Sequence, residues 1–244
     1  MQVTLLARPT LVYSRFTGHA YERTRSDQLC GTDAENIIEY AGRICYDSFN
    51  GKGRSSTDYA AHILEVDHGS VLEHAQFTFL IQGVSRCLTH ELIRHRVGTA
   101  ISQRSTRYCD ESEVRFVRHA AESGVSVSQL NAREHAQAAY RQTARRLEEG
   151  LVERGVSKLS ARKQARAAAA RYLPQGLETE LVWSANVRAL RHVIMMRASD
   201  AADAEIRELG VQLLEVVRPH VPAYLADLEI VPAEDKLGQV VRRK

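Results

Sequence analysis

The chain has 244 residues, of which 44% are hydrophobic, and this is enough to bury a sizeable core in one domain. A formal net charge of +3 and a pI near 8.7 are too mild for a typical nucleic-acid binder. No apolar run reaches the ~20 residues that span a bilayer, and the N-terminus lacks the pattern of a signal peptide. We therefore expect a cytoplasmic protein with neither a nucleic-acid nor a membrane partner.

Common cofactor and metal signatures are missing from the sequence. The four cysteines are scattered without CxxC spacing, so neither a zinc site nor a disulfide framework is expected. GxGxxG, P-loop and GxSxG patterns are absent as well. The string beginning at His90 fails as a zinc-protease motif, because HExxH needs a second histidine where Arg94 stands. We expect no bound metal.

In the first half of the chain, residues 2–6 predict a strand, and Thr32 with Glu35 forms a capping box at the start of a helix. The apolar face of that helix is expected to carry Ile37, Ile38, Ala41 and Ile44. A second helix is expected at 57–66, a mobile loop at 51–53, a buried strand at 76–81 and a helix at 84–96.

In the second half, residues 113–118 predict a strand, 129–154 and 159–172 predict helices, and 177–184 predict a further strand. Residues 186–218 are expected to be helical with a break near 199–200. We predict an α+β, helix-rich single domain with a small mixed or antiparallel sheet over residues 1–230. Residues 231–244 are expected to form a loose C-terminal tail.

The segment from Arg94 to Tyr108 contains four arginines, a histidine and several hydroxyl groups without one acidic residue. Guanidinium groups bind phosphate bidentately and stay charged at any working pH. This segment therefore predicts a site for a phosphorylated small molecule. Only five of the 33 basic residues are lysine, and this excess of arginine fits either phosphate recognition or a biased genomic composition.

Five segments together resemble the flavin-dependent thymidylate synthase family, over about residues 32–230: DHGSVLEHAQFTF (67–79), THELIRHR (89–96), SQRSTRY (102–108), KQARAAAARYLP (163–174) and NVRALRHVIMMRASDAADAEIR (186–207). The RHR triplet followed after a short spacer by SxRY is the most specific of them. The resemblance implies a homotetramer with active sites shared between subunits. It also implies FAD as cofactor, NADPH as reductant, 5,10-methylenetetrahydrofolate as carbon donor and reductive C5-methylation of dUMP to dTMP.

The resemblance further assigns residues to two ligands. Residues expected at the flavin are His68, Ser70, Arg94, His95, Arg96, Gln103, Asn186, Arg188 and His192. Residues expected at the nucleotide are Glu91, Arg94, Gln103, Arg104, Ser105, Arg107, Arg171 and Arg197.

Arg197 and Ser105 are the candidate catalytic residues. A fixed guanidinium stabilises the negative charge that develops on a uracil ring during C5-methylation, and Arg197 matches that role. Ser105 is expected to donate a hydrogen bond, since no base is evident beside it to make it a nucleophile. Because the family takes its hydride from reduced flavin, an activated cysteine is unnecessary.

Two departures from the family pattern lie on the nucleotide side. The loop from Arg96 to Arg107 is one residue longer at Val97-Gly98-Thr99, and Ala170 stands where an arginine is usual. Either Arg171 replaces that arginine or one contact is lost.

A roomier pocket would leave UMP open as an alternative substrate, with Thr99, Ser102 or the shifted backbone as a partner for the 2′-hydroxyl. A relative that has lost synthase activity and acts as an NAD(P)H oxidase or assembly component is the other alternative.

Overall fold

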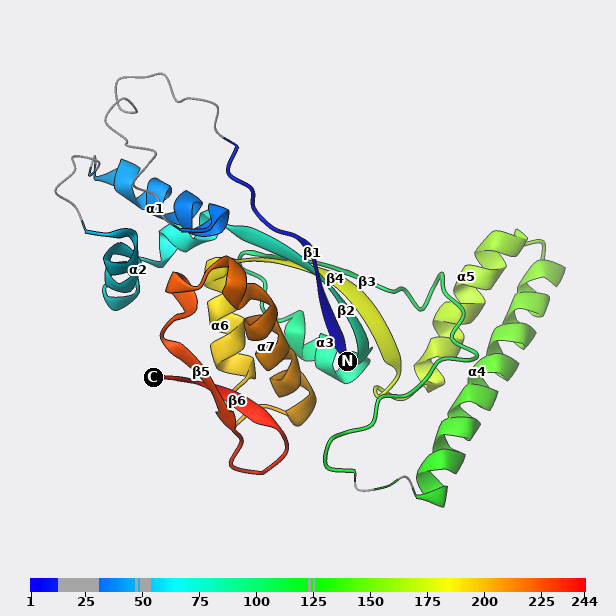
Figure 1. Cartoon of the computed structure of the whole chain (residues 1–244). Helices are drawn as coiled ribbons and strands as arrows, with labels where there is room; N and C mark the ends of the chain where they lie inside the picture. Colours follow the sequence, from blue (N-terminus) through cyan, green and yellow to red (C-terminus); the bar gives the residue numbers. More distant parts are fainter. Residues whose placement is uncertain (13–30, 47, 49–53, 123, 125) are drawn as a thin grey trace. The chain divides into compact units, whose positions relative to one another are not determined.

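The computed structural model describes residues 1–12, 31–46, 48, 54–122, 124 and 126–244. The expected loop at 51–53 and Cys30 lie outside the described residues. The elements in Figure 1 are, in chain order, β1 (Gln2–Ala7), α1 (Asp33–Cys45), α2 (Ser56–Glu65), η2 (Gly69–His74), β2 (Gln76–Ser85), α3 (Arg86–Leu92), β3 (Thr99–Gln103), α4 (Val127–Glu153), α5 (Lys158–Ala169), η3 (Ala170–Tyr172), β4 (Glu178–Asn186), α6 (Val187–Arg197), α7 (Ala204–Val217), η4 (Arg218–His220), η5 (Ala223–Leu225), β5 (Leu228–Pro232) and β6 (Gln239–Arg243). The described chain is helix-rich α+β, as predicted.

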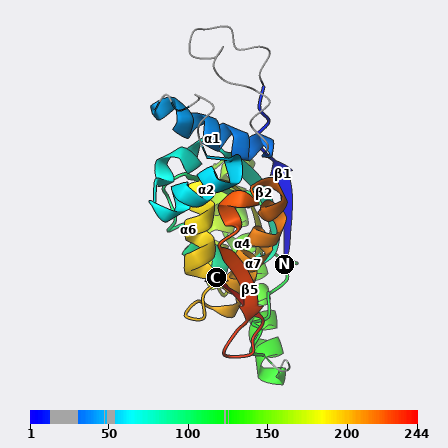
Figure 2. The same ribbon diagram turned by 60° about the vertical axis from the view of Figure 1, so that its left-hand side comes forward.

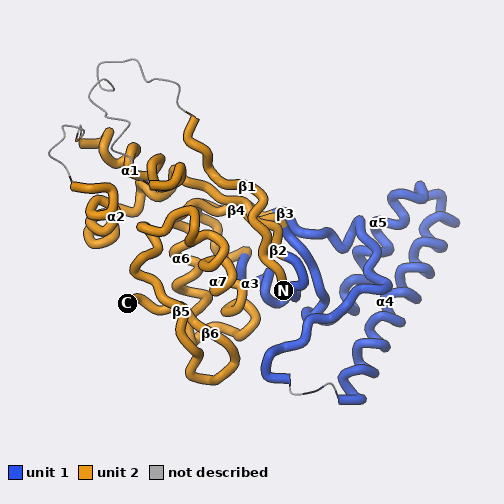
Figure 3. Tube along the Cα trace, in the orientation of Figure 1, with its two compact units in different colours: residues 1, 82–92, 102–181 blue, residues 2–81, 93–101, 182–244 orange. Residues whose placement is uncertain are grey.

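The described chain forms two compact units (Figure 3). Unit 1 comprises residues 1, 82–92 and 102–181, and unit 2 comprises residues 2–81, 93–101 and 182–244. The four-stranded sheet has the order β1-β2-β4-β3, and β2, β3 and β4 each run from one unit into the other. The chain passes from one unit to the other within these strands, so the sequence contains no linker or change of composition at the unit boundaries.

Unit 2 is built around aromatic residues of β2 and β4. Phe77 and Phe79 are completely buried, and the Phe79 ring stacks on Trp183 with centroids 6.0 Å apart. Helices α6 and α7 lie side by side in both views (Figures 1 and 2) and bury Leu190 and Leu214. Each such side chain contributes on the order of 1.5–3 kcal/mol by leaving water.

Helix α1 begins at the predicted capping box, in which Thr32 and Glu35 bond each other's backbone N–H. Its buried face differs from the predicted one, because Ile44 is 49% exposed while Gly42 is buried. A Cβ atom at Gly42 would lie 1.8 Å from the Tyr59 hydroxyl oxygen. Gly42 therefore lies on the buried face because Tyr59 fills the space that a side chain would need. The periodicity of apolar residues could not reveal this contact.

The prediction of a loose tail is wrong. Strand β6 pairs with β5 in an antiparallel two-stranded sheet, in which Val231 is opposite Val240. Val240 and Val241 are buried, and the Val241 N–H donates to the Ala198 carbonyl. Arg207 of α7, almost fully buried, donates to Asp235 and to the Leu237 carbonyl. Apolar burial and a buried arginine thus hold the C-terminal hairpin.

Unit 1 contains the helical hairpin of α4 and α5, both close to their predicted ranges. Alanines at four-residue spacing, Ala161, Ala165 and Ala169, are buried on the α5 face, where small side chains allow close packing. The strand predicted at 113–118 is wrong. Only Phe116 forms an isolated bridge, to Leu177, because the segment opposite turns with a Leu177 N–H to Pro174 carbonyl bond.

The helix expected at 84–96 is shorter than predicted. Strand β2 continues through Gly83, whose φ of +67° suits glycine, and α3 begins only at Arg86. The Ser85 hydroxyl accepts the Leu88 N–H and so fixes the start of this helix. Since α3 ends at Leu92, Arg94, His95 and Arg96 lie in the loop that follows.

Candidate functional site

Three residues expected at the flavin come together at one end of unit 2. His68 precedes η2, which carries Ser70, and α6 approaches this turn with Arg188. A Cβ atom on Gly69 would lie 3.0 Å from the Arg188 Nε, and Val187 donates its N–H to the Ala75 carbonyl. His68, Ser70 and Arg188 are all exposed, so their polar atoms are accessible to a ligand.

Asn186 joins the start of α6 to the loop that follows α3. Its side-chain Oδ1 accepts the Ala189 N–H as a helix cap, and its backbone N–H donates to the Gly98 carbonyl. Gly98 has a φ of +70°, and a Cβ atom there would lie 2.5 Å from the Asn186 Nδ2. The turn at Gly98, which lies where the sequence departs from the family pattern, therefore requires glycine.

His95, His192 and Arg197 form a second contact group in unit 2. The Arg197 Nε donates a 2.8 Å hydrogen bond to the His95 Nε2, and the two imidazole rings lie edge to face with centroids 5.4 Å apart. Burial lowers the pKa of His95, and the positive field of Arg197 lowers it further. His95 is therefore neutral at physiological pH.

Arg94 and Arg96 are exposed in the loop between α3 and β3. Among the residues that the structure describes, neither has a hydrogen bond or an ion pair. Arg188 is bonded to Glu73 at 2.6 Å, yet its side chain remains 56% exposed. We call Arg94, Arg96 and Arg188, with His68 and Ser70, the cationic set of unit 2. Such exposed guanidinium groups favour an anionic ligand.

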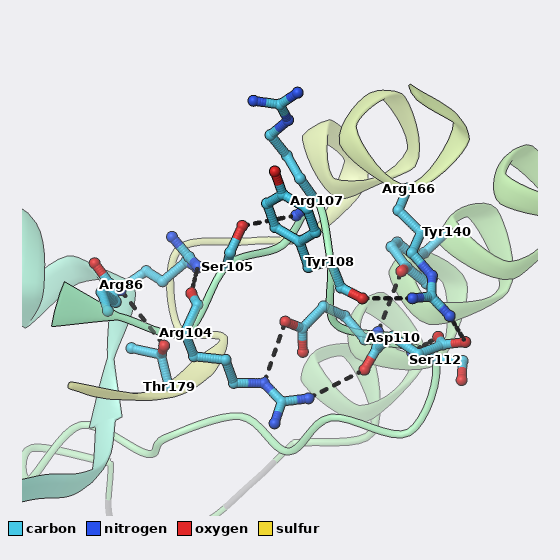
Figure 4. A network of polar contacts seen from close by, with 12 residues as sticks. Arg86, Arg104, Ser105, Arg107, Tyr108, Asp110, Ser112, Tyr140, Arg166 and Thr179 are labelled. Carbon is cyan, nitrogen blue, oxygen red and sulfur yellow. Dashed lines mark hydrogen bonds and ion pairs between the residues drawn. The ribbon is translucent and has the colours of Figure 1, made fainter. Parts of the chain in front are cut away.

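Residues 104–110, which we call the arginine loop, lie in unit 1 (Figure 4). Arg104 is turned toward the chain itself, since its Nε is 3.5 Å from Glu111 Oε1 and its Nη2 donates to the Asp110 carbonyl. Glu111 is almost fully buried, and burial raises its pKa, although Arg104 and Arg86 oppose the shift. In this structure Arg104 therefore holds the loop.

Arg166 of α5 holds the other end of the arginine loop. Its Nη1 donates to the Tyr108 carbonyl at 2.6 Å, and its Nη2 donates to Asp110 Oδ2 at 3.1 Å. Arg166 lies four residues before Ala170 and so shares its helix face. Arg166 therefore stands one helical turn before the position of the expected arginine, and it bonds both the backbone and a side chain of the arginine loop.

Ser105 and Arg107 are oriented differently from Arg104. The Ser105 hydroxyl oxygen accepts the Arg107 backbone N–H at 3.3 Å, which leaves its own O–H to donate. The Arg107 side chain extends away from Asp110 in Figure 4, with its guanidinium carbon 5.9 Å from the Tyr108 ring centre. Of these loop residues, Arg107 is the better placed to bind an external anion.

The remaining predicted residues of unit 1 are more dispersed. Gln103 donates its side-chain amide to the Thr89 hydroxyl at 3.1 Å, and Glu91 is half-buried in α3. Arg171 lines a separate groove of about 540 Å³, together with Phe116 and residues of α4. The lining of this groove contains no residue of the arginine loop, so the structure does not bring Arg171 to Arg107 there.

The family model described as thymidylate synthase complementing protein matches residues 29–223. The chain is 42% identical over 216 residues to a flavin-dependent thymidylate synthase of Mycolicibacterium gilvum, with 84% of each chain covered. It is 41% identical over 213 residues to the enzyme of the same name from Mycobacterium tuberculosis strain H37Rv, again with 84% of each covered. The chain belongs to the flavin-dependent thymidylate synthase family.

The fold agrees with this assignment. A crystal structure of thymidylate synthase X from Helicobacter pylori with FAD and dUMP is similar, with a TM-score of 0.55 at 20% identity. The match covers 92% of this chain and 99% of that one. The curated relatives are named as enzymes, and this family member is an enzyme of the same type.

Sequence reasoning missed several residues that organise this family member's candidate site. Gly98 permits the close approach of Asn186, and Gly69 permits that of Arg188. Only Gly98 had a sequence signal, which was its position in the loop that departs from the family pattern. Arg166 carried a usable signal, since it stands one helical turn before the anomalous Ala170. Glu111 carried none, because an acidic residue after an arginine-rich segment is ordinarily exposed.

Other side chains of the described chain add little to the site. Cys45, Cys87 and Cys109 form no disulfide, and Cys109 meets Ser105 through the backbone, where its N–H donates to the Ser105 carbonyl at 2.9 Å. No group of three or more potential metal ligands occurs among the described residues. None of the described helices is long and apolar enough to cross a membrane.

Proposed function

We propose that this chain methylates dUMP at C5 to give dTMP, with bound FAD, 5,10-methylenetetrahydrofolate as carbon donor and NADPH as reductant. The observation that carries this proposal is the hydrogen bond that holds Arg197 against His95, in a chain 42% identical to flavin-dependent thymidylate synthases. The relative from Helicobacter pylori was crystallised with FAD and dUMP, which supports the same two ligands here.

The residues present fit a flavin dinucleotide. A pyrophosphate needs several N–H or O–H donors and positive charge, and the cationic set supplies three guanidinium groups with His68 and Ser70. Asn186, 8% exposed, ties α6 to the Gly98 turn, and this link orders the loop that bears Arg94 and Arg96. Bound flavin, once reduced, supplies the hydride that converts the transferred methylene to a methyl group.

The chain's own residues perform the remaining tasks. Arg107 binds the phosphate of the nucleotide, and Ser105 donates a neutral hydrogen bond. Arg197 stabilises the negative charge that develops on the pyrimidine when C5 becomes nucleophilic, and one such preorganised donor contributes on the order of 10²–10³ in rate. Arg104, Arg166 and Gln103 hold the segment that carries Ser105 and Arg107.

The structure gives no support to UMP as the preferred substrate. Gly98, in the part of the loop that departs from the family pattern, packs closely against Asn186, which leaves no added room there. The Thr99 hydroxyl, one of the suggested partners for a 2′-hydroxyl, uses its proton in a hydrogen bond to the His95 carbonyl at 2.6 Å. We therefore assign dUMP as the substrate.

A homotetramer with shared sites is part of the proposal. Large apolar side chains are exposed beside the residues of unit 2 discussed above: Ile93 is 41% exposed, Val97 84% and Met196 55%. Large apolar side chains exposed in this way are typical of a surface that another subunit covers. Light scattering of the purified protein should give the mass of four chains, and a monomer that turns over would contradict shared sites.

The test is a complete-mixture assay with omissions. Purified protein is incubated with FAD, dUMP, methylenetetrahydrofolate and NADPH, and dTMP is measured by mass spectrometry. We expect dTMP only when every component is present, and little methylated product when UMP replaces dUMP. A protein that takes up no FAD, or one that oxidises NADPH without forming dTMP, contradicts the proposal.

A further inference from the structure

The contact between Arg197 and His95 has a defined direction. Arg197 ends α6, and its Nε–H can only donate, so the His95 Nε2 at 2.8 Å must be the acceptor. A ring nitrogen accepts only when it carries no proton, which places the single proton of neutral His95 on Nδ1. The His95 backbone is fixed separately by the Thr99 hydroxyl. The imidazole is thus a fixed acceptor for one nitrogen of one guanidinium.

The surroundings keep His95 in this form. Burial lowers its pKa most, and Arg197, His192 and Arg94 each lower it further. Helix α6 contributes Arg197 and the edge-on ring of His192, and the loop itself contributes Arg94. Nδ1-protonated His95 therefore persists at neutral pH, and the acceptor is lost only when the pH falls below the ordinary histidine value of 6.5.

We propose that His95 is a positioning residue for Arg197, whose guanidinium plane it orients toward the pyrimidine. A guanidinium is planar, so holding its Nε edge fixes the directions of its terminal N–H groups. An arginine at a helix end otherwise samples several rotamers, and ordering it costs free energy at each turnover. The inference rests on the proposed function, which assigns Arg197 to the pyrimidine. It gives His95 a task other than the flavin contact that the family resemblance implies.

Two substitutions separate the acceptor from the bulk of the ring. His95→Gln keeps a side-chain acceptor that does not titrate, and His95→Leu removes the acceptor. The kcat for dTMP, divided by bound flavin, and the KM for dUMP are measured between pH 5.5 and 8.5. We expect His95→Leu to lower kcat about 100-fold, the effect of a misplacement near 1 Å, with a smaller change in KM.

His95→Gln should retain most of the wild-type kcat at pH 8 and should lack the fall in kcat that the wild type shows below pH 6.5. A His95→Gln variant as slow as His95→Leu overturns the proposal. So does a His95→Gln variant in which kcat still falls below pH 6.5 as it does in the wild type. His192→Gln is the matched control, because its ring neighbours His95 without the hydrogen bond to Arg197. The His192→Gln variant should still show the fall in kcat at low pH, shifted to higher pH because His192 lowers the pKa of His95. If the fall in kcat disappears in His192→Gln, it belongs to His192 and the proposal is wrong.

A measurement without turnover distinguishes this inference from the proposed function. In protein labelled with ¹⁵N-histidine, NMR shifts report the tautomer of each ring, and the His95→Gln spectrum identifies the His95 signals. We expect the Nδ1–H tautomer with a pKa below 6.5, and a rise of that pKa in Arg197→Met. If the Nδ1–H tautomer is found but the protein forms no dTMP, the proposed function is rejected and the hydrogen bond between Arg197 and His95 still stands. An Nε2–H tautomer in an active enzyme would reject only the positioning role.

Discussion

The arginine loop of unit 1 and the cationic set of unit 2 use the same side chain in different ways. In unit 1, Arg104 and Arg166 are bonded to Glu111, Asp110 and backbone carbonyls. In unit 2, Arg94 and Arg96 are exposed, and neither is paired with a carboxylate of the described residues. Arg188 of the cationic set is also paired, with Glu73, and Arg107 of the arginine loop is not paired with a carboxylate of the described residues. Arginines with internal acceptors therefore stabilise the chain, whereas the others keep their guanidinium groups available to an anion.

This difference has an energetic basis. A buried carboxylate such as Glu111 needs a positive partner, because an unpaired buried charge is strongly destabilising. Exposed like charges repel one another, and a bound phosphate relieves that repulsion. The paired and the unpaired arginines should therefore respond differently to substitution: the paired ones in stability, and the unpaired ones in ligand binding.

The largest expected effect is that of Arg197→Ala. The variant should lose methylation by at least ~10²–10³-fold, because the pyrimidine loses its charge-stabilising donor, and should keep most NADPH-dependent flavin reduction. Product formation and flavin bleaching are followed separately on one preparation. Arg243→Ala, at a 70% exposed arginine on β6, is the control and should retain both activities. Equal loss of both activities in Arg197→Ala would contradict the assignment.

Arg107 and Arg104 test the comparison within one loop. Arg107→Ala should raise the KM for dUMP ~10–100-fold, as expected for a lost charge-assisted hydrogen bond, and leave the melting temperature unchanged. Arg104→Ala should lower the free energy of unfolding by about 1–3 kcal/mol, since Arg104 is partly exposed and Arg86 still acts on Glu111. A loss of stability in Arg107→Ala and a raised KM for dUMP in Arg104→Ala would show that Arg107 holds the loop and Arg104 binds the nucleotide.

The pH dependence of Arg104→Ala sharpens this test. Burial raises the pKa of Glu111, so the folded protein holds its proton to higher pH than the unfolded chain does. Stability attributable to this group therefore falls as the pH rises above the ordinary value of 4.5. Without Arg104 the fall should be larger, and urea unfolding at pH 5 and pH 8 measures it. A stability loss independent of pH would contradict the Glu111 pairing.

Arg166→Ala should have a smaller effect on activity. Loss of its bonds to Tyr108 and Asp110 should loosen the arginine loop and raise the KM for dUMP ~5–20-fold, near the free energy of one or two hydrogen bonds. Hydrogen exchange of residues 104–110 should become faster. Arg162→Ala, one turn earlier on α5 and paired with Glu148 at 3.2 Å, is the matched control. Unchanged exchange in Arg166→Ala would remove its loop-holding role.

Val241→Ala should affect stability alone. Its side chain is 2% exposed in the C-terminal hairpin, and removing two methyl groups should cost about 1–3 kcal/mol of unfolding free energy. The kinetic constants for dUMP should not change. A variant as stable as the wild type would support the loose tail that the sequence indicated.

Elements with local signals were predictable from the sequence. The capping box at Thr32 and Glu35 placed α1, and the apolar spacing of residues 186–218 gave α6, α7 and the break between them. Elements that depend on distant partners were not. Strand β6 exists because Ala198 and Arg207 hold it, and residues 113–118 meet only a turn at Pro174.

The sequence proposed the residues of the candidate site, and the structure shows what each of them contacts within the chain. The family motifs singled out Arg94–Arg96, Arg104–Arg107 and Arg197. They could not separate Arg104 from Arg107, because the distinction depends on Glu111, whose burial is a tertiary property. The partner of Arg197 was equally hidden, since His95 lies 102 residues away along the chain.

The most direct test of the division between the two regions is a pair of binding measurements on two variants. FAD affinity is measured by titration without nucleotide, and dUMP affinity is measured at saturating FAD, for Arg96→Ala and Arg107→Ala. We predict that Arg96→Ala weakens FAD binding ~10-fold or more with dUMP affinity kept, and that Arg107→Ala does the opposite. If both variants weaken the same ligand, the division between the two regions is wrong.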